Sequence, residues 1–316
     1  MTGSEGASGP LVSVVIPTYY RNETLARTIE SVQDQTHRPI EIVVVDGSGE
    51  ANAKPVANEY GVRYLAQDRD EGPHAARSEG AEIAKGTYVN FLDDDDRFHP
   101  EKIERQLTVI EGNESVGVVY CGIEWESGHL VYPNPDIQGD VLEYALRFRM
   151  TPGSPSTMLI DASVLAGMLP LQNRHGADDM GMKIELAQRT EFAFVEDPLV
   201  TKGAADESLG GSRENIEGRF ELLNRYADLY EQFPSSVYGD AIAHTYLLDA
   251  ENRLDERMWS AKAIYSALRA CYHVPGLPIS FAGYLVASLF GRPGRNLGWN
   301  LYGRFFLGDE HRGKIT

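Results

Sequence analysis

Short apolar runs and helical stripes alternate along the first 120 residues of the chain. The runs predict buried strands at residues 12–16, 40–45, 62–65, 88–92 and 116–120. Between them, apolar residues recur at helical spacing, as in the sets Leu25, Ile29, Val32 and Ile103, Leu107, Ile110. A strand–helix alternation of this kind predicts an α/β fold, a mostly parallel sheet with helices on both faces.

Capping signals mark the start of two of these helices. Asn22 precedes the first apolar stripe and is expected to cap that helix, and Pro100 stands where the first residue of a later helix would lie. Residues 73–84 are rich in alanine and predict a further helix that stops before Gly86.

The pattern changes after about residue 121, which suggests an internal division of the chain. Residues 122–175 mix short strands with Pro/Gly-rich loops, residues 178–189 predict a helix, and residues 214–272 are helical in composition. We therefore expect a disordered lead-in at 1–10, a catalytic domain at 11–213 with halves at 11–120 and 121–213, and a helical extension at 214–316.

The charge balance excludes one class of partner. The 316 residues include 47 acidic and 29 basic side chains, a formal net charge of -18, which argues against nucleic-acid binding. The two cysteines are far apart and lack the spacing of a metal site. No signal peptide and no run of about 20 apolar residues is visible, so we expect a cytoplasmic protein without a membrane span.

Polar residues gather where three of the predicted strands end. Thr18 to Glu23 follow the first strand, Asp46 ends the second, and Asp93 to Asp96 follow the fourth. Ligands of such sheets bind beyond the carboxyl ends of the strands. Four consecutive carboxylates repel one another unless they are solvated or hold a cation, and Mg²⁺ or Mn²⁺ prefers such oxygen ligands. The run is thus either a solvated acidic loop or a divalent-metal site.

Two further segments carry candidate chemistry. Gly72 opens the 73–84 helix, and Arg77 lies one turn into it, where its guanidinium is able to reach a diphosphate or the aspartate run, unless it is a surface arginine. Asp178 and Asp179 open the 178–189 helix. Aspartate is common at helix starts, but a carboxylate is also a usual general base.

The C-terminal region combines apolar and basic residues. Residues 277–290 are mostly apolar but too short to span a bilayer, and arginines and aromatic residues are interleaved after them at Arg292, Arg295, Trp299, Tyr302, Arg304, Phe305 and Phe306. Residues 277–307 are either a helical segment packed on the protein or a membrane-interface segment.

Several of these motifs together resemble the family 2 glycosyltransferases, which have the GT-A fold. The resemblance rests on Val-Val-Ile-Pro-Thr-Tyr (14–19), Arg21-Asn22-Glu23, Ile29-Glu30-Ser31-Val32, Glu41 to Ser48, Gly72, Ala76-Arg77 and Phe91 to Asp96. It covers roughly residues 11–205, more weakly after 120.

The resemblance implies a role for each candidate residue. Nucleotide-sugar contacts would come from Pro17, Thr18, Tyr19, Arg21, Glu23, Asp46, Gly72, Arg77, Asp93 and Asp94. Asp93 and Asp95 resemble the metal-binding DxD motif, with Asp96 beside it. Asp178-Asp179 is similar to an acidic pair whose second member is the base, which makes Asp179 the predicted catalytic residue. The chain departs from the pattern with Asp178 in place of Glu and with Met180-Gly181 after the pair.

The implied activity is a metal-dependent, inverting transfer of a hexosyl-type sugar from a UDP- or GDP-sugar. The acceptor would be a glycan or a lipid-linked, dolichyl-phosphate-type molecule at the cytoplasmic face of the membrane, and the acidic composition resembles haloarchaeal enzymes of protein N-glycosylation. A dinucleotide oxidoreductase is disfavoured because no Gly-x-Gly-x-x-Gly follows the first strand. The alternatives are a sugar nucleotidyltransferase or an inactive nucleotide-sugar-binding module.

Overall fold

The computed structural model describes residues 9–203, 212–274 and 279–296, which form two compact units. The first unit comprises residues 9–145, 149–173 and 178–203, and the second comprises residues 146–148, 174–177, 212–274 and 279–296. No helix in these described ranges is both long enough and apolar enough to cross a membrane.

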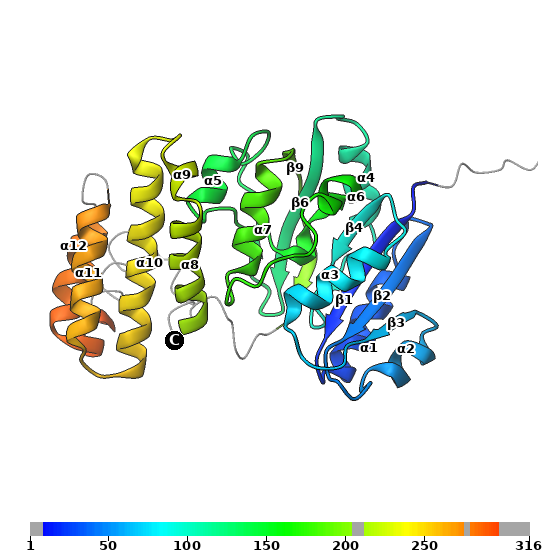
Figure 1. The fold of residues 1–316 in the computed structure, drawn as a ribbon, viewed down its shortest axis with the longest axis horizontal. Coiled ribbons are helices and arrows are strands. Elements are labelled where there is room, and N and C mark those ends of the chain that lie inside the picture. Colours follow the sequence, from blue (N-terminus) through cyan, green and yellow to red (C-terminus); the bar gives the residue numbers. More distant parts are fainter. Residues whose placement is uncertain (1–8, 204–211, 275–278, 297–316) are drawn as a thin grey trace, which may run out of the picture. The chain divides into compact units, whose positions relative to one another are not determined.

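The first unit is built on one mixed sheet, visible as the blue-to-green arrows of Figure 1. Within the described residues its order is β3-β2-β1-β4-β8-β6-β9-β5, and β7 pairs with β6. The strands are β1 (Val12–Thr18), β2 (Ile40–Asp46), β3 (Arg63–Ala66), β4 (Tyr88–Phe91), β5 (Arg97–Phe98), β6 (Val116–Trp125), β7 (Leu130–Val131), β8 (Leu159–Asp161) and β9 (Glu191–Lys202).

Strand direction changes at β8. Strands β1 to β4 are mutually parallel, β8 runs antiparallel to β4 and β6, and β9 pairs parallel with β6 and antiparallel with β5. Because the parallel strands end at one edge, the segments that follow β1, β2 and β4 lie at that edge. The predicted α/β fold is therefore confirmed, and the antiparallel β8, β5 and β7 are additions to the parallel pattern.

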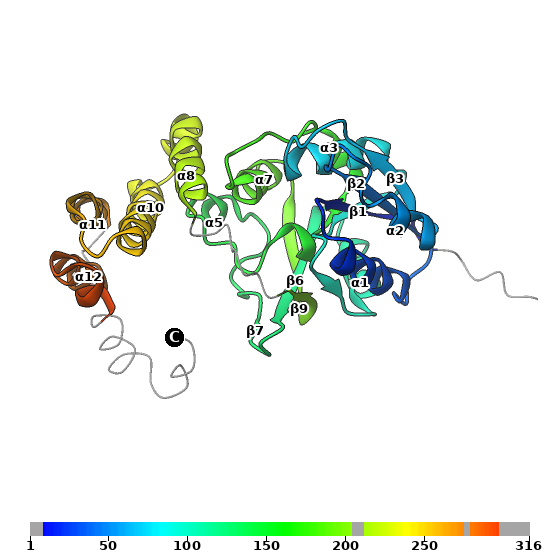
Figure 2. The ribbon, with the colours of Figure 1, turned by 90° about the horizontal axis from the view of Figure 1, so that it is seen from below.

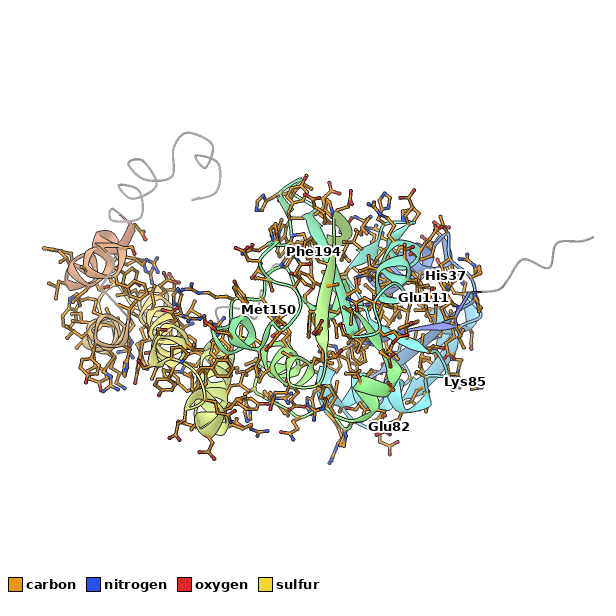
Figure 3. All side chains as sticks on the ribbon, turned by 90° about the horizontal axis from the view of Figure 1, so that it is seen from above. His37, Glu82, Lys85, Glu111, Met150 and Phe194 are labelled. Atoms are coloured by element: carbon orange, nitrogen blue, oxygen red, sulfur yellow. The ribbon has the colours of Figure 1, made fainter. Side chains whose placement is uncertain are left out.

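Helices cover both faces of this sheet, as the side-chain alternation of a buried strand requires. Val14 and Ile16 of β1 belong to the core shared with α1 and α4, whereas Val15 faces α3. The helical elements are α1 (Asn22–Gln33), α2 (Lys54–Glu59), α3 (Pro73–Ile83), α4 (Lys102–Ile110), α5 (Leu142–Leu146), η1 (Pro155–Thr157), α6 (Ala162–Ala166) and α7 (Asp178–Ala187). On β9, the ring of Phe194, labelled in Figure 3, lies 6.0 Å from that of Tyr120 on β6.

Two of the predicted helix starts are wrong. Arg21 occupies the N-cap position of α1, and Asn22 is the first helical residue, whose side-chain amide donates to the carbonyl of Asn52. Helix α4 begins at Lys102, so Pro100 lies before the helix and not at its first position.

Helix α3 packs on the sheet through a glycine. A Cβ added to Gly80 would lie 2.3 Å from Cγ1 of Val15 and 3.0 Å from Cγ2 of Val45. We expect Gly80→Ala to lower the free energy of unfolding by about 1–3 kcal/mol, because the helix must move off the sheet. Gly283→Ala is the matched control in thermal denaturation: Gly283 is an exposed helical glycine with open space around it, so alanine should stabilise by about 0.5–1 kcal/mol. Shifts of both melting temperatures in the same direction would contradict this account.

A lysine is buried between α4 and the sheet. The ammonium group of Lys102 donates to the side-chain oxygens of Asn90 and Gln106 and lies 4.2 Å from the ring centroid of Phe98. Asn90 in turn donates to the carbonyl of Ser156, at 3.3 Å. Burial lowers the pKa of Lys102 to about 8. Through the bond from Asn90 to Ser156, this network holds the backbone of η1 in place.

The buried lysine gives stability a pH dependence of known sign. Its folded-state pKa of about 8 lies below the unfolded value of about 10.4, so the unfolded chain binds more protons between these two values. The contribution of Lys102 to stability is therefore lost as pH falls towards 8. Relative to Lys102→Met, the wild type should gain about 2 kcal/mol between pH 7.5 and 9.5, measured by urea denaturation. A difference between the two proteins that does not vary with pH would contradict the prediction.

The second unit is helical, drawn from yellow-green to red in Figure 2. Its helices are α8 (Arg213–Arg225), α9 (Ala227–Tyr230), α10 (Ser235–Glu256), α11 (Ala261–His273) and α12 (Ile279–Leu289). The C-terminal helical extension expected from the sequence is thus present. Phe281 and Tyr284, on one side of α12, pack in two apolar clusters with alanines of α10 and α11. The expected aromatic residues from Trp299 to Phe306 lie outside the described residues.

Candidate functional site

The aspartate run forms a turn between β4 and β5. The amide of Asp96 donates to the carbonyl of Asp93 at 3.0 Å, which closes the turn. Thr28 of α1 is buried and its hydroxyl donates to the carbonyls of Asp94 and Asp96, at 3.0 and 2.8 Å. Ser156 of η1 accepts from the amide of Asp93 at 3.2 Å. The backbone of the run is therefore held from two neighbouring elements.

The carboxylates of Asp94 and Asp95 turn towards the loop after β1. Asp94 accepts from the hydroxyl of Thr18 at 2.7 Å and from Arg21 at 3.2 Å, and Asp95 accepts from the same Arg21 nitrogen at 3.1 Å. Burial raises the pKa of Asp94 to about 6, against the opposing hydrogen bond from Thr18 and the charge of Arg21. The structure thus brings Thr18 and Arg21 to the run, as expected for segments at one sheet edge.

The carboxylates of Asp93 and Asp96 turn towards α3 and β9. Asp93 pairs with Arg77 at 2.7 Å, one of the two partners that the sequence predicted for this arginine. Lys202 lies 2.6 Å from Asp96 and 3.5 Å from Asp93. Burial alone would raise the pKa of Asp93, but the charges of Arg77 and Lys202 outweigh it and hold the pKa at about 2. Burial raises the pKa of Asp96 to about 6, which Lys202 opposes.

The run fits an open metal site and not a closed cage. In the part of the chain that the structure describes, no three His, Cys, Asp or Glu side chains converge as metal ligands. Mg²⁺ and Mn²⁺ bound beside phosphates, however, commonly use one or two carboxylates and complete their shell with water and phosphate oxygens. The side chains of Asp93 and Asp95 are 28% and 32% exposed, against 7% for Asp94 and 2% for Asp96. Asp93 and Asp95 are therefore the more accessible members of the run.

The remaining nucleotide candidates lie around the ends of β1 to β3. Tyr19 is 51% exposed, and its ring meets that of Tyr20 edge-on at 4.8 Å. Pro17 is buried within β1, Glu23 is exposed in the first turn of α1, and Gly72 is the N-cap of α3 with φ 86°.

Asp46 is directed into the protein. Its carboxylate is buried and accepts from the amides of Ser48 and Ala53 at 2.9 and 2.8 Å and from the hydroxyl of Tyr64 at 2.8 Å. Burial would raise the pKa of Asp46, but these hydrogen bonds outweigh it and lower the pKa. A contact between Asp46 and a base or ribose stays a prediction. The ligand would have to bind carboxylate oxygens of Asp46 that already accept hydrogen bonds from the protein.

Several buried polar atoms have no partner among the described residues, and two of them bear on ligand binding at this edge. One is Nε of Arg77, beside the ion pair with Asp93. The other is Oε1 of Gln67, which lies next to Gly47 just past the end of β3, while the amide nitrogen of Gln67 donates to Glu79 at 2.8 Å. A free N–H donor and a free carbonyl acceptor are the groups that a diphosphate and a nucleobase would satisfy.

Asp179 is linked to the run through Lys183 and the η1 segment. Asp179 lies in the first turn of α7 and is 35% exposed, as predicted for a residue near the helix start. Lys183, one turn later, lies 3.4 Å from its carboxylate and donates to the carbonyl of Gly153 at 2.8 Å. Three residues on, Ser156 donates to Asp96 at 2.5 Å. The predicted base Asp179 and the aspartate run are therefore both connected to the segment from Gly153 to Ser156.

Sequence reasoning missed Lys202, Ser156, Lys183, Gln67 and Thr28. Two of these residues left a signal. Lys183 follows Asp179 by one helical turn, and Thr28 is a polar residue directly beside the apolar stripe of α1. Lys202 and Ser156 depend on pairings of β9 and η1 with distant segments, which no local pattern shows.

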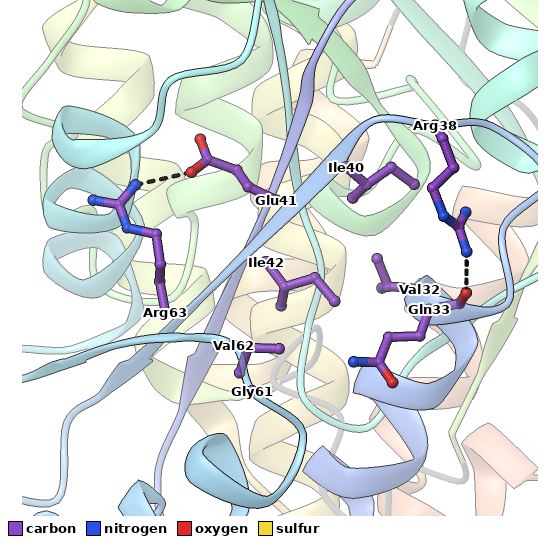
Figure 4. Close-up of a pocket in the computed structure, with 9 residues that line it drawn as sticks. All are labelled: Val32, Gln33, Arg38, Ile40, Glu41, Ile42, Gly61, Val62 and Arg63. Atoms are coloured by element: carbon purple, nitrogen blue, oxygen red, sulfur yellow. Dashed lines mark hydrogen bonds and ion pairs between the residues drawn. The ribbon is translucent and has the colours of Figure 1, made fainter. Parts of the chain in front are cut away.

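A pocket far from this site adds nothing to it. Figure 4 shows a cavity of about 450 Å³ at the amino-terminal ends of β2 and β3, the opposite edge from the run. Its apolar lining comes from the side chains of Val32, Ile40, Ile42 and Val62. Arg38 at its rim donates to the carbonyl of Gln33 at the end of α1, and Arg63 pairs with Glu41 at 2.9 Å. Both arginines are engaged in structural contacts.

Comparison with known proteins finds a family model that matches part of the chain and solved structures with the same fold. Residues 13–165, just under half of the chain, match the family model described as "Glycosyl transferase family 2". Glycosyltransferase AglE of Haloferax volcanii is 32% identical over 132 residues, which are 40% of this chain and 41% of AglE. The matches span only 18% to 42% of the length of the curated relatives, which include an uncharacterized glycosyltransferase of Haemophilus influenzae.

Two solved structures share the fold at low identity. S. aureus TarS 1-349 in complex with UDP-GlcNAc superposes with a TM-score of 0.64 at 15% identity, covering 91% of this chain and 89% of TarS 1-349. Mannosyltransferase PcManGT from Pyrobaculum calidifontis, in complex with GDP-Man and Mn²⁺, superposes with a TM-score of 0.57 at 16% identity, covering 92% of this chain and 83% of PcManGT.

Proposed function

Because this chain carries a domain of glycosyltransferase family 2, we propose that it transfers a sugar from a nucleotide sugar to a glycan or lipid-linked acceptor. The observation that carries the proposal is the aspartate turn at the carboxyl edge of the sheet, with Arg77 beside it and Nε of that arginine unpartnered among the described residues. A diphosphate oxygen would satisfy this donor and bring charge next to the carboxylates.

The donor nucleotide would lie over the ends of β1 to β3. Tyr19 offers an exposed ring for stacking on the base, and Oε1 of Gln67 offers an acceptor for a base N–H. The other nucleotide-sugar contacts are assigned to Pro17, Thr18, Arg21, Glu23, Asp46, Gly72, Arg77, Asp93 and Asp94. The complexes of TarS with UDP-GlcNAc and of PcManGT with GDP-Man support a UDP- or GDP-linked donor.

A divalent cation, Mn²⁺ or Mg²⁺, would be held by Asp93 and Asp95, with Asp96 as a further predicted ligand. When bound, the cation neutralises charge on the leaving nucleoside diphosphate. The partial exposure of the Asp93 and Asp95 side chains and the Mn²⁺ of PcManGT support this assignment. Arg77 contributes a second positive charge from the protein itself.

On the acceptor side, Asp179 would take the proton of the attacking hydroxyl. The hydroxyl oxygen then forms a bond to the anomeric carbon from the face opposite the nucleoside diphosphate, whose bond to that carbon breaks, so the configuration inverts. Lys183 fixes the direction of the Asp179 carboxylate through its contacts with Gly153 and Met150.

We place the catalytic domain at 11–213, with a nucleotide-sugar half at 11–120 and an acceptor half at 121–213, and the extension at 214–316. The match to AglE of a haloarchaeon and the net charge of -18 support a place in haloarchaeal surface-glycan synthesis, such as protein N-glycosylation on a dolichyl-phosphate-type lipid. The enzyme would then work at the cytoplasmic face of the membrane.

Charge and exposure in the extension support peripheral membrane contact. None of the 47 acidic residues lies between Arg257 and Leu307, whereas six basic residues do, at Arg257, Lys262, Arg269, Arg292, Arg295 and Arg304. Large apolar side chains are exposed there, among them Tyr265, Leu268 and Tyr272 on one stripe of α11 and Val286, Leu289 and Phe290 at the end of α12. An apolar surface with basic residues suits an anionic bilayer.

Vesicle sedimentation tests the membrane contact. The full chain should sediment with vesicles of anionic lipid, and a Tyr272→Glu/Phe290→Glu variant should stay in the supernatant. Tyr132→Glu is the control, because Tyr132 is 53% exposed but belongs to the first unit. Equal sedimentation of all three proteins would exclude this surface as the contact.

A panel of nucleotide sugars tests the function. Incubation with UDP- and GDP-sugars and Mn²⁺ should release nucleotide from at least one donor, and EDTA should abolish the release. An inactive binding module would bind a donor without releasing nucleotide. A sugar nucleotidyltransferase would instead form nucleotide sugar from sugar phosphate and nucleoside triphosphate.

A further inference from the structure

Lys202, the last residue of β9, extends its largely buried side chain into the aspartate run. Its Nζ lies 2.6 Å from Oδ2 of Asp96 and 3.5 Å from Oδ2 of Asp93. The side chain of Lys202 is 16% exposed and that of Asp96 only 2%, so little water screens the pair. One ammonium group thus bridges two of the four carboxylates.

The sheet fixes this position. Thr201 of β9 pairs with Arg97 of β5, which places Lys202 beside Asp96 at the next step of the antiparallel register. The backbone of Gly203 approaches the run so closely that an added Cβ would lie 2.6 Å from the carbonyl oxygen of Asp95. The end of β9 is therefore packed against the turn, and the ammonium group is tethered there.

The local charges nearly cancel before any ligand binds. Four carboxylates face three cationic side chains, Arg21, Arg77 and Lys202, so the fully ionised cluster sums to 3 − 4 = −1. A divalent cation alone would make the cluster positive. The same cation arriving with an anionic diphosphate would leave it close to balance.

We propose that Lys202 is a tethered counter-cation that holds Asp93 and Asp96 in the absence of a divalent cation and competes with that cation for their oxygens. The inference rests on the proposed function, because it takes the run as the donor-metal site. Lys202 is a positioning residue here, since it acts through the two carboxylates. It weakens metal binding in the absence of donor and so couples metal entry to the arrival of the diphosphate.

Titration with Mn²⁺ alone tests this inference, with free Mn²⁺ measured by electron paramagnetic resonance. Lys202→Met and Lys202→Gln should bind Mn²⁺ at least about tenfold more tightly than the wild type, because the competing charge is gone. Lys202→Arg keeps the charge and should bind like the wild type. Lys54→Met is the control, because Lys54 is an exposed lysine of α2, away from the run.

Thermal denaturation separates this role from a merely structural one. In EDTA, where neither the Lys202 ammonium group nor a divalent cation offsets the carboxylates, the neutral variants should melt below the wild type. Added Mn²⁺ should restore most of the lost melting temperature. A neutral variant that folds only when Mn²⁺ is present would also support the inference. A structural lysine would give a loss of stability that Mn²⁺ does not reverse.

Two results of the Mn²⁺ titration would overturn the inference. One is equal Mn²⁺ affinity in the wild type and the neutral variants, and the other is no Mn²⁺ binding to any of them. A failure of both neutral variants to fold with or without Mn²⁺ would likewise count against it, because the cation would then not replace the ammonium group. No sugar nucleotide is present in these measurements, so their outcome is separate from the donor panel.

Discussion

Asp179→Asn is expected to lower the turnover of the proposed sugar transfer by about 10³- to 10⁴-fold while leaving the affinity for the donor nucleotide within about threefold. Asparagine keeps the shape of the side chain but cannot take a proton from the acceptor hydroxyl. Asp179 lies in the first turn of α7, and the described contacts of its carboxylate go to Lys183 and not to the nucleotide region. The loss should therefore fall on the chemical step.

The measurement is steady-state transfer combined with calorimetric nucleotide binding. Asp228→Asn is the matched control, because Asp228 is an exposed aspartate in the first turn of α9 and belongs to the second unit. The control should keep wild-type turnover. A turnover of Asp179→Asn within tenfold of the wild type would remove Asp179 from the role of base.

The parallel part of the fold was predictable because each of its strands and helices carries its own periodicity. The runs ending at Ile16, Val45 and Leu92 correspond to β1, β2 and β4, whose carboxyl ends meet at one edge. The prediction that polar segments after these strands converge follows from that geometry alone. The contacts of Thr18 and Arg21 with the run agree with this prediction.

The part of the sheet beyond β4 was not predictable from local pattern. Strand β9 spans Glu191–Lys202 and contains Pro198, and its register against β6 shifts near Gly122. Such irregular strands have no clean alternation to detect. Lys202 was missed for this reason: its place beside Asp96 depends on the pairing of β9 with β5, which lies about 100 residues earlier in the chain.

Burial separates the members of the aspartate run, which the sequence alone could not do. Four identical side chains in succession look equivalent, yet Asp94 and Asp96 turn inward to Thr18 and Ser156, while Asp93 and Asp95 keep exposed surface. The reason is that Thr28 and Ser156 bind the backbone of the run from two sides and fix which carboxylates face the protein.

Asp95→Asn should have the second large effect, a loss of metal-dependent activity without a loss of folding. We expect turnover at low Mn²⁺ to fall by about 10²- to 10³-fold and the Mn²⁺ concentration for half-maximal activity to rise at least about tenfold. Asparagine removes the charge that would bind the cation. The described ion pair of Asp95 goes to Arg21, which is 57% exposed, so its loss should cost about 0–1 kcal/mol of stability.

Asp136→Asn is the control for this variant, because Asp136 is an exposed aspartate of the same unit outside the run. The two variants should melt at nearly the same temperature and differ in the Mn²⁺ dependence of nucleotide release. If Asp95→Asn kept the wild-type Mn²⁺ dependence, the cation would be held without Asp95. That result would count against the proposed site, because Asp93, the other partly exposed carboxylate of the run, is already paired with Arg77 and Lys202.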